Sequence, residues 1–372
     1  MKLLHTADLH IGAELAYLEN LREGRKYEVL ETFKNICTLC VKENVEFCLI
    51  SGDLFDSNAA ANEFAEPVFR YIRDTKNTNF LYVAGNHDPL NASSAFKKFE
   101  LPENLIVFGE DYETVEFPEY KVRATGRSFS HSSMEFCEME KMPQDNFINL
   151  LLLHADFGAS DGAYNPITSA FVENCGADYL ALGHIHKRTA VEKIGNTWLS
   201  YCGCPDGQGF DEVGEKGVYV GILNKDGCRL HFTPCSSRIH VVKKFDLSDA
   251  KNTEDAKKTI LDALLFEHGE NYDRNLYKLT LVGTPENLSD IKVPELLTEL
   301  KSKLYFVKIK NRLKQKLDLD LLSKEISLKG LFVNRMLEKI KVAEDDADKK
   351  QLIDALYLGL DAFDGEVAYN ED

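Results

Sequence analysis

The sequence predicts an α/β protein, in which a layered sandwich is followed by a small α+β unit and by C-terminal helices. Three observations predict this fold class. Buried apolar runs alternate with helical apolar spacing before residue 100, shorter strands follow with few helices between them, and the composition changes after residue 236. Alternating strands and helices imply parallel pairing with right-handed crossovers, which places helices on the faces of a sheet.

The N-terminal part reads as three strands with two helices between them. Apolar residues at helical spacing, such as Val29, Leu30 and Phe33, define the first helix. The expected elements are the strand 2–8, the helix 25–43, the strand 46–51, the helix 62–75 and the strand 79–84. Each strand ends in polar residues, and open α/β sheets place ligand sites at the carboxyl ends of their strands.

Two further regions follow. The sandwich continues with short strands at 105–108, 113–117, 120–125, 148–154, 178–182, 197–201, 217–223 and 229–234. A strand–helix–strand–helix–strand unit is expected at 238–246, 252–267, 275–282, 287–301 and 303–310, and two helices at 321–341 and 346–363. We therefore expect three domains, at 1–236, 237–316 and 317–372.

The net charge of −17 argues against a protein that coats nucleic acid, because phosphate binding needs clustered Lys and Arg. A nucleic-acid enzyme with a local basic patch is still compatible with this charge. Residues 301–316 contain seven basic residues and no acidic one, whereas 343–372 contain ten acidic residues against two lysines. The basic run is therefore the candidate patch.

Neither a membrane segment nor a disulfide framework is indicated. No run of 18 apolar residues occurs, and the start of the chain leaves no room for a signal peptide before His5 and Asp8. We expect a cytoplasmic protein with no membrane contact. The nine cysteines have spacings that suit reduced, small apolar residues better than a structural zinc site.

Five short polar blocks follow expected strands, and their residue types suit a hard divalent cation. Carboxylate, imidazole and amide oxygen are suitable ligands, and no thiolate is recruited. The blocks are Asp8-Leu9-His10, Gly52-Asp53, Gly85-Asn86-His87-Asp88, His154 and Gly183-His184-Ile185-His186. A lone Asp or His is usually a satisfied core or surface residue. Five blocks in order at five strand ends instead predict a metal site built from Asp8, His10, Asp53, Asn86, His154, His184 and His186.

Local geometry fits this prediction. Residues i and i+2 share a strand face, so Asp8 and His10 can point at one ion. The single carboxylate of Asp53 can bridge two metals through its two oxygens. Glycines before Asp53, Asn86 and His184 allow the backbone to approach closely or to adopt unusual dihedral angles.

In type and order, these blocks resemble those of the calcineurin-like metallophosphoesterases, over about residues 1–235. The resemblance implies a four-layer α-β-β-α sandwich and two divalent metal ions, Mn²⁺ first, with Fe, Zn or Mg as alternatives. The implied ligand sets are Asp8, His10, Asp53 and His186 for one metal, and Asp53, Asn86, His154 and His184 for the other. By the same resemblance, His87 acts on the phosphate as a proton donor or charge stabiliser, and Asp88 orients His87.

Finer likenesses suggest DNA as the substrate. The opening KLLHTADLHIG, the block ISGDLFDSN and the unit after residue 236 resemble the SbcD branch of DNA repair exonucleases, where that unit is a DNA-binding cap. The segments 203–221 and 326–340 resemble a YhaO-type Gram-positive subgroup. These resemblances imply a DNA exonuclease or endonuclease that works with an SbcC-like coiled-coil ATPase and forms a homodimer.

The chain departs from this branch at Asp56, where some relatives carry a histidine. An acid near the DNA path cannot play a cationic role. The function of that histidine in the relatives therefore cannot simply be assigned to Asp56. Arg127 and His131 are candidates for a replacement positive charge. An equally good interpretation makes them solvent-exposed loop residues.

Two C-terminal features have two interpretations each. Lys301, Lys303, Lys308, Lys310 and Arg312 can meet DNA phosphates, or they can be a solvated edge strand protected by its lysines against further sheet pairing. Apolar residues at helical spacing can dock on a partner coiled coil, or they can close the protein's own fold. These residues are Leu328, Leu331, Phe332, Met336, Leu337 and Ile340.

Three functions therefore compete. The first is a Mn-dependent DNA nuclease for repair and end processing with an ATPase partner. The second is a small-molecule phosphodiesterase or phosphatase with the same two-metal site, because fold and metals do not set the substrate. The third is a scaffold without activity, which the intact set of ligand-type residues argues against.

Overall fold

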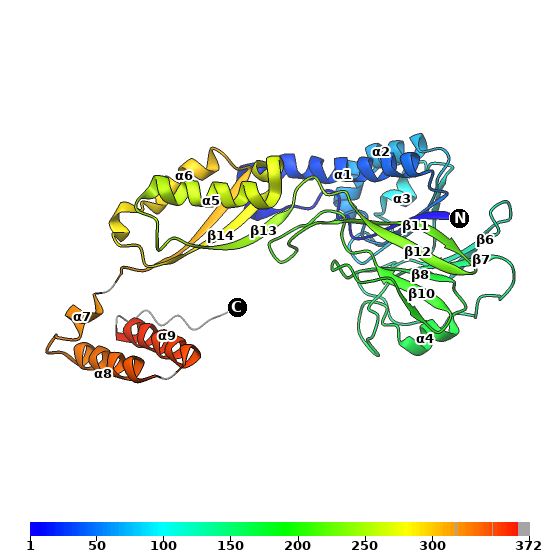
Figure 1. The fold of residues 1–372 in the computed structure, drawn as a ribbon. Helices are drawn as coiled ribbons and strands as arrows, with labels where there is room; N and C mark the ends of the chain where they lie inside the picture. The colour runs from blue at the N-terminus through cyan, green and yellow to red at the C-terminus, as the bar shows by residue number, and fades with distance from the viewer. Residues whose placement is uncertain (317, 344, 364–372) are drawn as a thin grey trace. The chain divides into compact units, whose positions relative to one another are not determined.

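The computed structural model describes residues 1–316, 318–343 and 345–363 (Figure 1). The chain divides into two compact units, one formed by residues 1–243, 265–279 and 300–308 and the other by 244–264, 280–299 and the residues from 309 onward. The three domains expected from the sequence remain a prediction, and residues 317, 344 and 364–372 of the last one lie outside the described residues.

The first large sheet has six strands in the order β12-β11-β1-β2-β3-β4. Their bounds are β1 Lys2–Thr6, β2 Phe47–Ser51, β3 Asn79–Val83, β4 Leu105–Val107, β11 Gly217–Asn224 and β12 Gly227–Pro234. β1 to β4 are parallel, with Leu4 opposite Cys48 and Ile50 opposite Tyr82. β11 and β12 add an antiparallel edge. The parallel part therefore carries the N-terminal polar blocks at one edge.

The second large sheet also has six strands, in the order β5-β6-β7-β8-β10-β9. Their bounds are β5 Glu113–Phe117, β6 Val122–Arg127, β7 Ile148–His154, β8 Tyr179–Gly183, β9 Glu192–Ile194 and β10 Thr197–Tyr201. β6, β7, β8 and β10 are parallel, and β5 and β9 are antiparallel at the two edges. His154 and Gly183 are thus neighbours at the carboxyl ends of adjacent strands.

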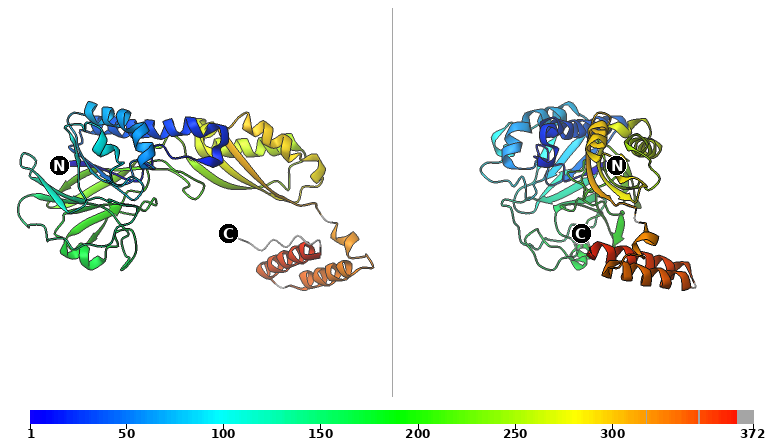
Figure 2. Two further views of the ribbon diagram at one scale, coloured as in Figure 1. Left: turned by 180° about the vertical axis from the view of Figure 1, so that it is seen from behind. Right: turned by 90° about the vertical axis from the view of Figure 1, so that its left-hand side faces the viewer.

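Three apolar layers hold the sandwich together. Phe33 and Phe69 of the outer helices pack on Tyr82 and its neighbours in the first sheet. Apolar residues of the two sheets pack face to face in the second layer, and α4 covers the far face of the second sheet in the third. The helices are η1 Ala16–Leu21, α1 Arg22–Glu43, α2 Asn58–Asp74, α3 Ala95–Lys98 and α4 Ser169–Asn174. The four-layer α-β-β-α sandwich is confirmed (Figures 1 and 2).

Capping residues explain where α2 starts and where α1 ends. Ser57 accepts a hydrogen bond from the backbone N–H of Ala60, so α2 begins four residues earlier than its apolar spacing predicts. α1 ends at Asn44, whose left-handed conformation (φ 52°) terminates the helix. Where a polar cap determines the end of a helix, the spacing of apolar residues does not predict that end.

The rest of the chain contains a three-stranded sheet and further helices. The sheet has the order β13-β14-β15, with β13 His240–Asp246, β14 Leu276–Gly283 and β15 Phe306–Leu313. The helices are α5 Thr253–His268, η2 Gly269–Arg274, η3 Leu288–Asp290, α6 Val293–Lys301, α7 Leu319–Leu322, α8 Leu328–Val342 and α9 Asp346–Phe363. None of the described helices is long and apolar enough to cross a membrane.

The helix expected over 321–341 is wrong as a single element. Ser327 accepts a hydrogen bond from the backbone N–H of Gly330 and starts α8 as a new helix after α7. α8 and α9 then pack on each other through Val333, Leu356 and Leu360. The two helices form a hairpin with its own small apolar core.

Candidate active site

The seven candidate metal ligands lie at the carboxyl ends of five strands, drawn from both large sheets. The ends of β1, β2 and β3 supply Asp8, His10, Asp53 and Asn86, and the ends of β7 and β8 supply His154, His184 and His186. Two hydrogen bonds join the two sets. The backbone N–H of His184 donates to Asp8 Oδ1 at 2.9 Å, and Nδ1 of His154 lies 3.0 Å from the carbonyl oxygen of Ser51.

His10 and His186 form the first group with Asp8. Their Nε2 atoms are 3.1 Å apart, and the ligand atoms of all three residues lie within 4.8 Å of one another. Because Nδ1 of His186 is bonded to a carboxylate, its proton belongs on Nδ1 and its Nε2 carries a lone pair. Imidazole lone pairs and a carboxylate that converge on one point are a donor set that fits a divalent cation.

His154 forms the second group with Asn86 and Asp53. Its Nε2 lies 2.9 Å from Asn86 Oδ1 and 3.3 Å from Asp53 Oδ2. A neutral ring that donates from Nδ1 to Ser51 turns a lone pair toward these two oxygens, which is repulsive unless a cation lies among them. Without a metal, a proton takes that place: burial opposes it, but the charge of Asp53 outweighs burial and raises the pKa of His154 to about 9.

Asp53 contacts both groups. Its Oδ2 lies 3.7 Å from Nε2 of His10, and its Oδ1 accepts a 2.9 Å hydrogen bond from the backbone N–H of His87. Burial opposes ionisation, but the charge of His154 and its hydrogen bond outweigh burial and hold the pKa of Asp53 below its usual value. A Cβ atom at Gly85 would collide with this carboxylate, so glycine is required there. An ionised carboxylate that contacts both groups could serve as a cation ligand in either of them.

The backbone at four of the candidate ligands is left-handed. φ is 53° at Asp8, 48° at His10, 47° at Asp53 and 98° at His184. Residues with side chains seldom adopt positive φ, each instance costs about 1–3 kcal/mol, and such residues gather at functional sites. The sharp turns after β1, β2 and β8 aim the side chains inward.

His87 lies at the open side of the site. Its ring packs edge-on against His10, with centroids 4.6 Å apart and an interplanar angle of 85°. Nδ1 lies 3.1 Å from the backbone oxygen of Asp56, which leaves Nε2 as the free nitrogen. The side chain is 44% exposed, whereas that of His10 is 2% exposed. His87 is therefore accessible to a molecule that enters from solvent.

Asp56, which departs from the SbcD-like pattern, lies beside both histidines. Its Oδ1 is 3.3 Å from Nδ1 of His10, outside hydrogen-bond geometry, and 4.0 Å from Nδ1 of His87. The acid adds negative charge at the open side of the site, as its type implies.

Among the described residues, Asp88 forms no hydrogen bond with the ring of His87 that it was expected to orient. Its Oδ2 accepts hydrogen bonds from the hydroxyl of Tyr82 at 2.6 Å and from the backbone N–H of Phe55 at 2.9 Å, and its Oδ1 accepts one from Gly85. Among the described residues, these bonds use the carboxylate without reaching His87. Burial, followed by the charge of Asp53, raises the pKa of Asp88 to about 6. Asp88 braces the turn that carries Asn86 and His87.

Two residues beside the site were missed by the sequence analysis. Glu212 contacts Nδ1 of His186 at 2.5 Å through Oε1, and its Oε2 accepts a 2.8 Å hydrogen bond from the backbone N–H of Gln208. The ring of Tyr164 lies over that of His184, with centroids 4.7 Å apart and an interplanar angle of 33°. Neither residue lies in one of the five polar blocks, and the only earlier signal for Glu212 was its place in the segment 203–221.

The cationic residues singled out earlier are exposed or make local contacts. Arg127 donates hydrogen bonds to the backbone oxygens of Glu110 and Glu135, and Nδ1 of His131 lies 3.0 Å from the Ser130 hydroxyl. The side chains proposed for DNA contact are all exposed: Lys301, Lys303, Lys308, Lys310 and Arg312. The last three alternate along β15 and so share one face of the strand. Their contact with DNA remains a prediction.

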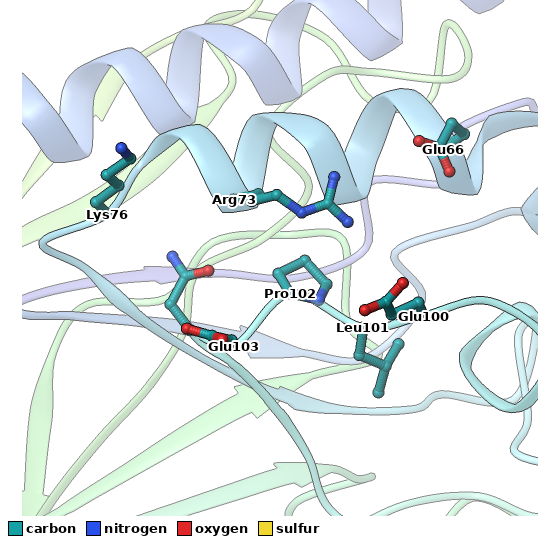
Figure 3. A pocket seen from close by; sticks show the side chains of 8 residues that line it. Glu66, Arg73, Lys76, Glu100, Leu101, Pro102 and Glu103 are labelled. Atoms are coloured by element: carbon teal, nitrogen blue, oxygen red, sulfur yellow. The ribbon is translucent and has the colours of Figure 1, made fainter.

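A cavity of 720 Å³ lies between α2 and the segment before β4 (Figure 3). Glu66, Glu100 and Glu103 line it together with Arg73 and Lys76, and it contains none of the candidate ligands. Three acids against two bases do not favour a phosphate. The site at the strand ends is therefore the better candidate for phosphoester chemistry.

The chain is similar to several known proteins. The chain is 26% identical over 267 residues to the metallophosphoesterase YhaO of Bacillus subtilis, which covers 68% of this chain and 64% of that protein. It is 22% identical to the DNA double-strand break repair protein Mre11 of Saccharolobus solfataricus, over 94% of this chain and 93% of that protein. It is 26% identical to a component of the nuclease SbcCD of Staphylococcus epidermidis, over 59% and 65%. The chain thus spans just under two thirds of the YhaO and SbcCD relatives.

Residues 1–188 match the family model of the calcineurin-like phosphoesterases. This segment is half of the 372 residues, and it includes all seven candidate ligands and His87. The chain belongs to the calcineurin-like phosphoesterase family, whose members are metal-dependent hydrolases of phosphoester bonds.

Proposed function

We propose that this protein hydrolyses phosphodiester bonds in DNA with two divalent metal ions, Mn²⁺ first among them. The observation that carries the proposal is the convergence of seven ligand-type side chains from two sheets, with His87 open to solvent beside them. In this proposal, Asp53 would belong to the ligand sets of both metals. Asp8, His10 and His186 complete one ligand set, and Asn86, His154 and His184 complete the other.

When bound, the two metals supply Lewis acidity at the phosphate and activate water for in-line attack. The protein's own groups position them. Ser51 fixes the ring of His154, and Glu212 fixes the ring of His186, so that both Nε2 atoms face the site. The backbone N–H of His87 holds one oxygen of Asp53.

His87 is the group that we assign to the substrate. Its Nδ1 is held at the backbone oxygen of Asp56, so a protonated ring presents Nε2–H outward. That proton can go to the leaving oxygen as the phosphorus–oxygen bond breaks, or it can stabilise charge on the phosphate. His87 thus acts on the phosphate, while the seven ligands hold the metals.

DNA is supported as the substrate by two kinds of observation. The relatives Mre11 and SbcCD carry names that refer to DNA break repair and to nuclease activity. The exposed cations of β15 offer phosphate contacts in the segment 237–316, which we propose as a DNA-binding cap. Residues 1–236 are then the nuclease domain.

For the last part of the chain we propose a docking site for a coiled-coil ATPase partner. Leu328 and Leu331 of α8 are 72% and 56% exposed, whereas Phe332, Met336, Leu337 and Ile340 pack in the hairpin with α9. The apolar stripe is therefore partly used by the protein itself. Changing Leu328 and Leu331 to Ser should abolish co-purification with an SbcC-like ATPase and leave the hairpin folded, and unchanged co-purification would contradict docking there.

A nuclease assay tests the proposed activity. The purified protein should degrade single- or double-stranded DNA with Mn²⁺, less with Mg²⁺, and not after chelation. It should be assayed with and without its ATPase partner. The proposal fails if DNA stays intact in every condition while cyclic nucleotides or phosphomonoesters turn over well, since that result favours the small-molecule alternative.

A further inference from the structure

A second cavity, 180 Å³ in volume, opens directly beside His186 and is lined by basic side chains. Lys187, Arg188 and Lys216 face it, and Glu215 is the single acid among its lining residues. The chain as a whole carries a net charge of −17, so a local excess of positive charge is not expected from its composition. The location, one residue from a candidate metal ligand, connects this cavity to the phosphoesterase site.

The three cations are available to a ligand. Lys187 and Arg188 are exposed and Lys216 is half-buried, and no ion pair among the described residues includes any of them. The Arg188 guanidinium instead lies over the ring of Phe232, with its central carbon 3.7 Å from the ring centre. Stacking fixes the plane of the guanidinium and leaves its N–H groups at the edge, where they can donate to a ligand.

Backbone contacts fix the walls of the cavity relative to His186. The backbone N–H of Cys204 donates to the backbone oxygen of His186 at 3.2 Å. Gly203 has a φ of 72°, and a Cβ atom there would lie 2.8 Å from both that oxygen and the backbone nitrogen of Arg188. Only glycine permits this close approach. The cations are therefore presented on a fixed frame, and not on a freely moving loop.

We infer that this cavity binds a phosphate group of the substrate strand next to the one that is cleaved. The inference rests on the proposed function and extends it to a second contact. Lys and Arg neutralise phosphate charge, and the planar guanidinium matches phosphate oxygens with two parallel hydrogen bonds. A small diester has no second phosphate, so this subsite distinguishes a polynucleotide from a small diester such as bis(p-nitrophenyl) phosphate.

Charge-removing variants test the subsite. The variants are Lys187→Gln, Lys216→Gln and the two together, with Lys193→Gln as the matched control. Lys193 lies in β9, 5.4 Å from the centre of the Trp198 ring, and does not line the cavity. Each single variant removes one positive charge and keeps a polar side chain of similar length. Equal circular dichroism and equal metal content across the set establish that the fold and the metal site are intact.

The first measurement is equilibrium binding of a fluorescent oligodeoxynucleotide to the metal-free protein at several salt concentrations. The double variant should bind about tenfold more weakly than the control. The slope of log affinity against log salt should shrink by about 0.7 for each cation removed. Affinity and slope that match those of Lys193→Gln would overturn the inference.

The second measurement is the ratio of kcat/KM for the oligonucleotide to kcat/KM for bis(p-nitrophenyl) phosphate. The ratio should fall about tenfold in the double variant, mainly through KM for the oligonucleotide. Inorganic phosphate separates the two possible sources of the ligand: if the variants lose affinity for free phosphate but keep that for the oligonucleotide, the strand assignment is overturned. A wild-type protein that binds DNA through these lysines without cleaving it would refute the proposed function and support the subsite.

Discussion

The Nδ1 atom of His186 lies 2.5 Å from Oε1 of Glu212, and this contact joins the metal site to a loop outside the family-matched segment. Burial opposes ionisation of Glu212, but the hydrogen bond from His186 outweighs it and lowers the pKa of Glu212 to about 2. A carboxylate in this position fixes the ring and makes the other nitrogen a better ligand.

Removing this carboxylate should weaken metal binding. We expect Glu212→Ala to lower Mn²⁺ affinity about 10- to 100-fold, measured by calorimetric titration of the metal-free protein, with Glu212→Gln in between. Asp211→Asn is the matched control, because Asp211 is an exposed acid next in the chain. Equal affinities for Glu212→Ala and Asp211→Asn would show that Glu212 does not position His186.

His87→Gln should separate chemistry from metal binding. His87 is exposed beside the site and belongs to neither of the two proposed ligand sets, so metal content should stay at the wild-type level. kcat should fall by about 10²–10⁴-fold, the range expected when a positioned proton donor is lost. Metal analysis and hydrolysis of a chromogenic diester measure the two effects. Unchanged metal content together with unchanged kcat would remove His87 from the mechanism.

The sequence predicted the fold class and the residues at the strand ends because both depend on local patterns. Buried apolar runs, helical spacing and polar residues after strands can each be recognised within a short segment of the sequence. A strand of three residues is recognised only when it is apolar: β4 (LIV) was expected, whereas β9 (EKI) has no apolar run and was missed. The hydrogen-bond partner of Asp88 could not be predicted from the sequence either. Its position next to His87 suggested a contact with that ring, but the carboxylate accepts a hydrogen bond from the hydroxyl of Tyr82 in β3 instead.

The same reasoning explains why Glu212 was missed. It is 26 residues from His186, in a polar loop where an acid is normally a solvated surface residue. The left-handed backbone at Asp8 and His184 is also invisible to residue type, because neither is a glycine. Strain of this kind depends on how the two sheets meet, which only the packed structure determines.

His5 should make the protein acid-sensitive. It is fully buried in β1, with Nδ1 2.9 Å from the hydroxyl of Tyr179, and burial lowers its pKa to about 3. Because the folded pKa is below the unfolded value of about 6.5, the folded protein favours the neutral ring. The associated stability is complete above pH 6.5 and is lost as the pH falls toward 3, by about 2 kcal/mol at pH 5.

His5→Asn tests this, because Asn keeps a hydrogen-bonding side chain but does not titrate. Urea denaturation of the metal-free proteins at pH 7 and pH 5 gives the two free energies of unfolding. The loss between these pH values should be about 2 kcal/mol smaller for the variant than for the wild type. Other titrating groups cancel in this difference. Parallel losses in the two proteins would contradict the buried neutral state of His5.

Arg25 and Asp206 form an ion pair that is buried on both sides, at the start of the loop that carries Glu212. Arg25 also donates to the hydroxyl of Ser237 at 2.8 Å, and the hydroxyl of Thr32 donates to Asp206 at 2.7 Å. Removing Arg25 leaves the buried charge of Asp206 without its cation, so Arg25→Met should cost about 3–5 kcal/mol of unfolding free energy. The double change Arg25→Met with Asp206→Leu should cost clearly less than the sum of the two single changes. Denaturant titration of the wild type, the two single variants and the double variant gives the four free energies of unfolding. Strictly additive losses would show that the two charges do not stabilise each other.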